Sequence, residues 1–427
     1  MRIFYDSSKL IIGPAPHVGV LDLPGSLKRP PVRLLFPARP PSEGRRVHRA
    51  GYFIDNRVAY ILLGFMHIAL ARSTTKVGLK DLNAIIISSS SDSLKKTFRF
   101  VIRPIVWFFS IFFPARFFRI PHTTLLKIKG RTSVDYAHPS TFSEEKKQEL
   151  IVFSHGLTGS GDEHSILGAA LAKQGYIVAI VHHRDGSSSR VPMPDGTCKY
   201  YEHLPNGDDY DPKHRLEQVH RRTKEFLFTC DWLLGDECCD DDEAVRPVIE
   251  QIRKGIDREQ IHAAGFSYGA ATASLASALQ PRKFKSAIFL DGWFHIDFSS
   301  RGIEFDFPPE SFGNAWPRYP PVANAEELNE KSRESSAPNG LDIPSIFINS
   351  SQFESYSKLY RATKRLGSQV DGSEMHVIQD TGHQSFCDLP FWLPKKLGSK
   401  AFQLGSADAY KTYETTLCLI QNFLARQ

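Results

Sequence analysis

The residues best suited to chemistry stand in the run Gly265-Phe-Ser-Tyr-Gly269, a Gly-x-Ser-x-Gly pattern. The apolar stretch 261–264 before it predicts a strand, and the small residues from Ala270 onward predict a helix. A serine on so sharp a strand-to-helix turn is held in a strained conformation, and small flanking residues avoid steric clashes. Its hydroxyl then lies at the positive end of a helix. We predict that Ser267 is a nucleophile; the alternative is a serine in an ordinary glycine-rich turn.

A serine nucleophile needs a general base and a carboxylate that orients the base. Where such a turn is used, the chain order is Ser, then Asp or Glu, then His. Asp291 directly follows an apolar run 24 residues after Ser267, and catalytic groups collect at the carboxyl ends of parallel strands. His383 follows a later apolar run, in a loop position that suits a general base. Asp297 and Asp380 compete with Asp291 for the role of the acid.

The oxyanion formed when Ser267 attacks a carbonyl needs two backbone N–H donors. One donor is the residue after the nucleophile, Tyr268, and the other comes from a loop after an early strand. The run Ser154-His-Gly-Leu157 stands at such a place. Gly156 lets the backbone approach a ligand closely, so we predict Leu157 as the second donor; a plain turn is the alternative.

The elements that must position these residues alternate between buried strands and helices. Apolar runs predict strands at 150–153, 176–181, 261–264, 286–290, 345–348 and 375–378. Helical spacing marks 164–174, 213–234 and the C-terminal segment from Ala407, which we expect Ser406 to cap. This alternation predicts parallel strands joined by helices. Together with the serine turn, it predicts an α/β-hydrolase fold: a mostly parallel sheet with helices on both faces and an N-terminal extension.

The first third of the chain is harder to assign to elements. Alternating apolar residues at 18–23 and 32–37 predict two strands that pair with one another. We expect 1–145 to be an N-terminal extension with edge strands and a basic aromatic segment, and 146–427 to be the catalytic core. The two parts are expected to form one structural domain.

The composition excludes some classes of protein. At 427 residues, 41% hydrophobic and 23% charged, the chain is too apolar for wholesale disorder. Its formal net charge of +6 is small for a dedicated nucleic-acid binder, so we expect no nucleic-acid partner. The charge is uneven, because residues 1–130 hold 21 Lys and Arg against 6 Asp and Glu. Such a surface suits an anionic membrane; a merely solubilising surface is the alternative.

The segment 98–120 is unusually aromatic and basic. It holds eight phenylalanines, one tryptophan and four arginines, and its apolar run is shorter than the ~20 residues that cross a bilayer. Two interpretations stay open: an interfacial membrane anchor, or core packing against the main domain. The membrane-contact candidates are Trp107, Phe108, Phe109, Phe112 and Phe113.

Metal, redox and targeting signals are weak. His182 and His183 lack a third ligand at metal spacing, and the acidic run 236–243 lacks the spacing of a calcium loop. We therefore expect no metal and no cofactor. Six cysteines are few for this length, and the chain starts without the apolar stretch of a secretory signal. We expect a cytoplasmic protein, peripheral to membranes if the anchor interpretation holds; no feature sets an oligomeric state.

Seven motifs, taken in their order along the chain, resemble the serine-dependent platelet-activating factor acetylhydrolases, the calcium-independent phospholipases A2 of the plasma and liver intracellular type. The motifs are Phe153-Ser-His-Gly-Leu, His183-Arg-Asp-Gly-Ser-Ser-Ser, Gly255-Ile-Asp-Arg-Glu-Gln-Ile, Gly265-Phe-Ser-Tyr-Gly-Ala-Ala-Thr, Leu290-Asp-Gly-Trp, Phe347-Ile-Asn-Ser and Gly382-His-Gln-Ser-Phe. The resemblance spans about residues 150–390. It implies calcium-independent hydrolysis of a phospholipid substrate.

Carried over residue by residue, the resemblance implies the same five functional positions. The nucleophile, acid and base fall on Ser267, Asp291 and His383, and the oxyanion donors on Leu157 and Tyr268. The turn departs from the family at Phe266 and Tyr268, where His and Phe are common, and Gly292 stands where Ala is common. These departures leave the triad intact and bear on the preferred acyl chain.

The expected function is hydrolysis of the sn-2 ester of platelet-activating factor-like glycerophospholipids that carry acetyl, short or oxidised acyl chains. A Ser-His-Asp triad would work through an acyl-enzyme. A phospholipase A1, a neutral-lipid esterase or a transacylase would use the same triad. An alternative from a different class is a catalytically silent lipid-binding scaffold.

Overall fold

The computed structural model describes most of the region from residue 147 onward and two segments before it. The described residues are 6–38, 123–126, 147–195, 197–202, 212–237, 246–294, 341–356, 360, 363, 364, 366, 367, 370–392 and 404–427. The segment 98–120, with the candidates Trp107, Phe108, Phe109, Phe112 and Phe113, lies outside these ranges. Among the helices that are described, none combines the length and the apolar composition needed to cross a bilayer.

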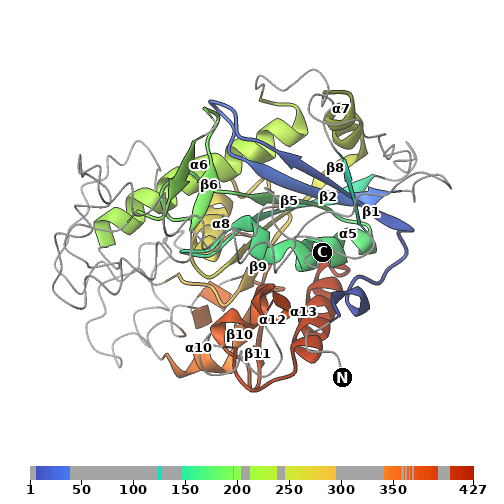
Figure 1. Cartoon of the computed structure of the whole chain (residues 1–427). Helices are drawn as coiled ribbons and strands as arrows, with labels where there is room; N and C mark the ends of the chain where they lie inside the picture. The colour runs from blue at the N-terminus through green and yellow to red at the C-terminus, as the bar shows by residue number, and fades with distance from the viewer. Residues whose placement is uncertain are drawn as a thin grey trace, which may run out of the picture.

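Nine strands form the main sheet of the described chain (Figure 1). They are β1 (His17–Leu23), β2 (Val32–Ala38), β3 (Thr123–Leu126), β4 (Gln148–Ser154), β5 (Ile177–Val181), β8 (Ile256–Phe266), β9 (Ser286–Leu290), β10 (Ser345–Ser350) and β11 (Glu374–Ile378). Their order is β11-β10-β9-β8-β4-β5-β2-β1-β3. A separate two-stranded sheet joins β6 (Arg190–Pro192) to β7 (Cys198–Tyr200).

The main sheet is mostly parallel. Every neighbouring pair from β11 to β5 is parallel, whereas β2 is antiparallel to both β5 and β1. Strand β1 is in turn parallel to β3. Val32 of β2 stands opposite Val181 of β5, so the strands that precede residue 145 continue the same sheet as those that follow it. Parallel strands put their carboxyl ends at one edge, where catalytic groups collect.

Helices cover both faces of this sheet. They are α5 (Ser165–Gln174), α6 (Pro212–Leu234), α7 (Arg246–Gly255), α8 (Tyr268–Leu279), α10 (Ser351–Ser355), α12 (Leu389–Trp392) and α13 (Ala409–Leu424). Helices α6, α7 and α8 pack into one hydrophobic cluster, and α5 and α13 pack into a second cluster on the opposite face. This is the α/β-hydrolase arrangement that the alternation of strands and helices predicts.

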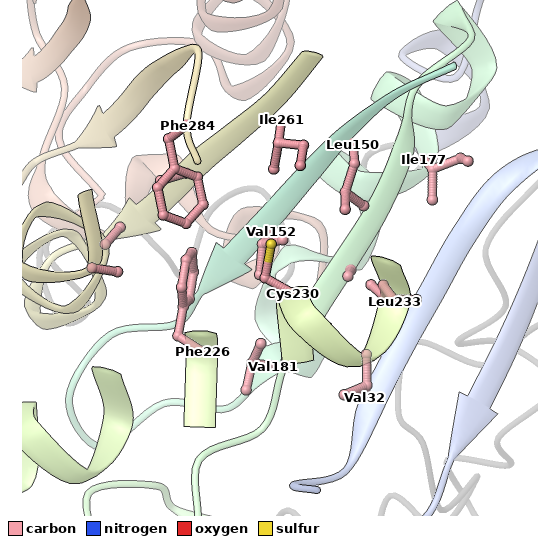
Figure 2. Close-up of a cluster of buried hydrophobic side chains, with 14 of the residues drawn as sticks. Val32, Leu150, Val152, Ile177, Val181, Phe226, Cys230, Leu233, Ile261 and Phe284 are labelled. Carbon is pink, nitrogen blue, oxygen red and sulfur yellow. The ribbon is translucent and has the colours of Figure 1, made fainter. Parts of the chain in front are cut away.

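The side-chain period of two explains how one strand serves two cores. Leu150 and Val152 of β4 join the cluster under α6, and Figure 2 draws both among the buried side chains of that cluster. Ile151 and Phe153 point the other way and join the cluster under α5 and α13. Because both faces are buried, the strand reads as a continuous apolar run in the sequence.

One expected helix start is wrong. Helix α13 begins at Ala409, and its N-cap is Asp408, whose carboxylate accepts hydrogen bonds from the backbone N–H groups of Tyr410 and Lys411. Ser406 lies two residues before that cap, and its N–H donates to the carbonyl of Asp380, 2.8 Å away. That bond holds the chain in a turn one step before the helix.

Candidate active site

The serine turn has the strained geometry that its sequence predicts. Ser267 lies between β8 and α8 with φ 54° and ψ −121°, a left-handed φ that costs energy for any residue except glycine. A Cβ on Gly265 would lie 2.3 Å from the carbonyl oxygen of Gly269, and a Cβ on Gly269 would lie 2.0 Å from that of Ser154. Both flanking positions therefore require glycine, and the tight packing fixes the direction of the serine side chain.

Three of the predicted residues meet at the carboxyl edge of the sheet. The Nε2 atom of His383 lies 2.9 Å from Oγ of Ser267, and its Nδ1 atom lies 2.9 Å from Oδ2 of Asp291. A neutral imidazole with its proton on Nδ1 donates to Asp291 and accepts the serine hydroxyl proton at Nε2. Ser267 is 6% exposed and Asp291 is fully buried. This is the relay that nucleophilic catalysis by serine requires.

The Asp291 carboxylate is held by its own set of contacts. Asp291 follows β9 with φ 44°, and its carboxylate accepts 2.6 Å hydrogen bonds from the N–H and the Oγ of Ser350. The N–H of Trp293 donates to the carbonyl of Ser267 at 2.9 Å, which ties the turn at Asp291 to the turn at Ser267. No role was predicted for Ser350; its place at the end of the next strand, beside β9, is the signal that could have found it.

The competing titratable residues that the structure describes make other contacts. Asp380 is exposed at φ 60°, and its backbone carbonyl accepts from Ser406 and Ala407. Asp297 is outside the described residues. His376, on β11, bonds Glu374 at 3.0 Å. Of the two candidate acids that the structure describes, Asp291 is the one that contacts His383.

The predicted oxyanion donors flank the nucleophile. A Cβ on Gly156 would lie 3.1 Å from the ring of Phe266 and 3.3 Å from Cβ of Ser267, so the loop after β4 runs directly against the nucleophile. Tyr268 is the first residue of α8. Within the described part of the chain, neither the N–H of Leu157 nor that of Tyr268 donates to a protein acceptor. Both amides are thus available to a developing negative charge.

Two buried histidines, His155 in this loop and His183 beside Ser154, are neutral. His155 bonds the carbonyl of Gly156 at 2.8 Å, and His183 bridges Oγ of Ser154 and the carboxylate of Glu225 at 2.9 and 3.0 Å. Burial lowers the pKa of both imidazoles well below 6.5, and the positive charge of Arg222 lowers it further. Among the described residues, no three His, Cys, Asp or Glu side chains gather into a metal site.

Comparisons with known proteins show which family this chain resembles. A family model described as "Platelet-activating factor acetylhydrolase, isoform II" matches residues 116–297 and 333–427. The chain is 28% identical over 271 residues to the platelet-activating factor acetylhydrolase of Bos taurus, covering 59% of this chain and 51% of that protein. It is 25% identical over 317 residues to that of Cavia porcellus, covering 70% and 63%. The chain thus spans about half the length of the first relative.

A solved structure supports the fold. The ferulic acid esterase from Streptomyces cinnamoneus superposes with a TM-score of 0.53 at 18% identity, covering 97% of this chain and 91% of that chain. At so low an identity the likeness concerns the arrangement of strands and helices and does not extend to the substrate.

Proposed function

The chain belongs to the platelet-activating factor acetylhydrolase, isoform II, family, and from that premise we propose that it is a lipid ester hydrolase. The proposed substrates are glycerophospholipids that carry an acetyl, short or oxidised acyl chain at sn-2. One observation carries the proposal: His383 lies 2.9 Å from both Ser267 Oγ and Asp291 Oδ2. Family membership supports a phospholipid ester as the proposed substrate.

In the proposed reaction, Oγ of Ser267 attacks the acyl carbonyl while Nε2 of His383 takes the hydroxyl proton. Asp291 holds the Nδ1–H and stabilises the imidazolium. The carbonyl oxygen, now an oxyanion, accepts hydrogen bonds from the N–H groups of Leu157 and Tyr268. His383 returns its proton to the leaving lysophospholipid oxygen, and the acyl group stays on the serine.

Hydrolysis of the acyl-enzyme repeats these steps with water as the nucleophile. His383 takes a proton from the water, the oxyanion forms again, and the serine leaves with that proton. The charge that develops is met by backbone donors and by Asp291. The proposed reaction therefore uses neither a metal ion nor a cofactor.

The test combines Ser267→Ala with a panel of phospholipids of graded sn-2 chain length. Ser267→Ala should lower kcat by about 10⁴–10⁶-fold and abolish labelling by a fluorophosphonate, while the protein stays folded. The wild type should release the short sn-2 acids preferentially. Preferential release of sn-1 acids would favour a phospholipase A1, and a labelled protein that hydrolyses only uncharged esters would favour a neutral-lipid esterase.

Association with a membrane is a further part of the proposal. It depends on Trp107, Phe108 and the other aromatic candidates of segment 98–120, so it stays a prediction from the sequence. Trp107→Ser combined with Phe108→Ser should release the protein from anionic liposomes and leave hydrolysis of a soluble ester intact. Unfolding of this double variant would instead place the rings in the core.

A further inference from the structure

Arg222 is a buried arginine that the proposed chemistry does not use directly. It lies on α6 and is 0% exposed. Its guanidinium donates to Oγ of Ser187 at 2.8 Å, to Oγ of Ser154 at 3.2 Å, and to the carbonyl of His155. Burying a cation is costly unless well-placed partners accept its hydrogen bonds. A buried arginine that donates to three such acceptors therefore calls for a structural reason.

The partners of Arg222 belong to the segments that carry the proposed oxyanion donors. Ser154 and His155 come directly before Gly156 and Leu157. On the other side, the N–H of Thr158 donates to the carbonyl of Ser187 at 2.8 Å. Arg222 therefore holds the chain immediately before Leu157 directly, and the chain immediately after it through Ser187.

The second donor segment is held by the same side chain. The guanidinium carbon of Arg222 lies 4.9 Å from the ring centroid of Tyr268, within the range of a cation–π contact. The hydroxyl of Tyr268 donates to the backbone carbonyl of Arg215, which lies on α6 seven residues before Arg222. Both donor segments are thus fastened to α6, and the Arg222 side chain contacts both of them.

An acidic partner balances this charge through a relay. Oγ of Ser187 donates to Oδ1 of Asp185 at 2.6 Å while it accepts from Arg222. A guanidinium presents its N–H groups in a rigid planar fork, so it can hold Ser187 on one nitrogen and Ser154 with His155 on another. The ammonium of lysine is a single point charge and cannot span these acceptors in the same way.

We propose that Arg222 is a positioning residue that sets the separation of the Leu157 and Tyr268 N–H groups by fastening both segments to α6. This inference rests on the proposed function, since it concerns the oxyanion of that reaction. The loss of one oxyanion donor lowers kcat by about 100- to 1,000-fold, and displacement of the donors by removal of Arg222 should approach that range.

The test uses the full chain and the variants Arg222→Met and Arg222→Lys. Active sites are first counted by fluorophosphonate labelling, and kcat and KM for a soluble short-chain ester are then expressed per labelled site. The affinity for an alkyl trifluoromethyl ketone is measured in parallel, because its adduct with the serine places an oxyanion in the same hole. We expect kcat and the ketone affinity of Arg222→Met to fall by roughly 100-fold together, with KM nearly unchanged.

Arg222→Lys separates the shape of the fork from its charge. The kcat and ketone affinity of Arg222→Lys should fall nearly as far as those of Arg222→Met. Wild-type values in Arg222→Lys would overturn the positioning role. Arg33→Met is the matched control, because Arg33 is also fully buried and donates to Asp22 and Ser165. It should lower the unfolding temperature and leave kcat per labelled site unchanged.

If Arg222→Met fails to fold, Ser187→Ala decides, because it removes one acceptor of Arg222 and leaves the guanidinium in place. We expect its kcat and ketone affinity to fall together by about three- to tenfold, and unchanged values would overturn the inference. A wild type that neither labels at Ser267 nor hydrolyses esters would refute the proposed function itself. Activity in the wild type with unchanged Arg222 variants would refute only the role of Arg222.

Discussion

The phenyl ring of Phe266 lies stacked on the imidazole of His383, with ring centroids 4.8 Å apart and planes inclined by 26°. The same ring lies against Gly156, where a Cβ would be 3.1 Å away. Phe266 thus packs between the loop after β4, at Gly156, and the proposed base, His383. An aromatic face beside an imidazole favours the imidazolium that forms during the proposed reaction, so Phe266 should act on the base as well as on the fold.

Phe266→Leu keeps an apolar side chain and removes the stacked ring. The contact that affects kcat is the cation–π contact with the imidazolium, worth about 0.5–2 kcal/mol, which corresponds to a fall in kcat of roughly 2- to 30-fold. The measurement is kcat per labelled site on a soluble ester. Phe226→Leu, a change in the core where Phe226 packs against Phe284, is the control and should leave kcat unchanged. Equal kcat values for wild type and Phe266→Leu would contradict the role of the stack.

Asp291→Asn tests the acid. An asparagine of the same shape cannot hold the Nδ1–H tautomer of His383, and a change of this kind lowers kcat by about 10⁴-fold. Asp380→Asn is the matched control, because Asp380 is exposed and does not contact the histidine. Steady-state kinetics on both variants decides, and comparable losses in the two would reopen the assignment.

Ser350→Ala tests the support of the acid. Ser350 Oγ donates to Asp291 at 2.6 Å, and a hydrogen bond to a charged group contributes about 1.5–3 kcal/mol. We expect kcat/KM to fall by roughly tenfold or more. The hydroxyl also caps α10 by accepting from Phe353 N–H, so the free energy of unfolding must be measured alongside.

Ser351→Ala is the control for that change. Ser351 is the residue after Ser350, and its hydroxyl donates to the carbonyl of Thr381 and not to the Asp291 carboxylate. It should keep wild-type kcat/KM. A loss of activity as large as that of Ser350→Ala would mean that general loosening of α10, and not the support of Asp291, causes the effect.

The sequence predicts the elements whose signals are local. The Gly265 and Gly269 spacing marks the serine turn because the steric conflict there involves near neighbours, and the apolar runs mark strands that are buried on both faces. The fold class alone predicts the chain order of the three roles, with the nucleophile first, the acid second and the base last. Ser267, Asp291 and His383 stand in that order. The rule that functional groups follow parallel strands left both Asp291 and Asp380 as candidates, since Asp380 follows β11. The resemblance to the acetylhydrolase motifs favoured Asp291, and the contact with His383 agrees with that preference.

Contacts set by the sheet order are not visible in the sequence. Ser350 meets Asp291 across 59 positions and Arg222 meets His155 across 67, and each pair depends on which strand or helix lies beside which. An arginine on an amphipathic helix is normally expected in solvent, so the burial of Arg222 has no local signal. The cap of α13 was misplaced because a serine two positions before Asp408 satisfies the same local preference.

Besides His155 and His183, two more buried histidines have a lowered pKa, and such groups make the stability of the protein fall in acid. His164 packs between the rings of Phe153 and Phe266, with centroids 4.6 and 5.2 Å away, and burial lowers its pKa to about 3. Burial, with the charge of Arg33, lowers the pKa of His182 to about 3 as well. Both imidazoles are neutral in the native state, whereas the unfolded chain protonates them below pH 6.5.

The sign of this effect follows from proton binding. As pH falls below 6.5 the unfolded state binds a proton that native His164 does not bind, so the free energy of unfolding decreases, by at most about 1.4 kcal/mol per pH unit for each histidine. His164→Phe keeps a ring between Phe153 and Phe266 and removes the proton site. Between pH 6.5 and 5.0 the variant should therefore lose about 1.6 kcal/mol less stability than the wild type. Urea unfolding at these two pH values measures the difference, with pH 8 as the reference, well above the usual pKa of a histidine in an unfolded chain. Parallel pH dependence in both proteins would show that His164 titrates in the native state.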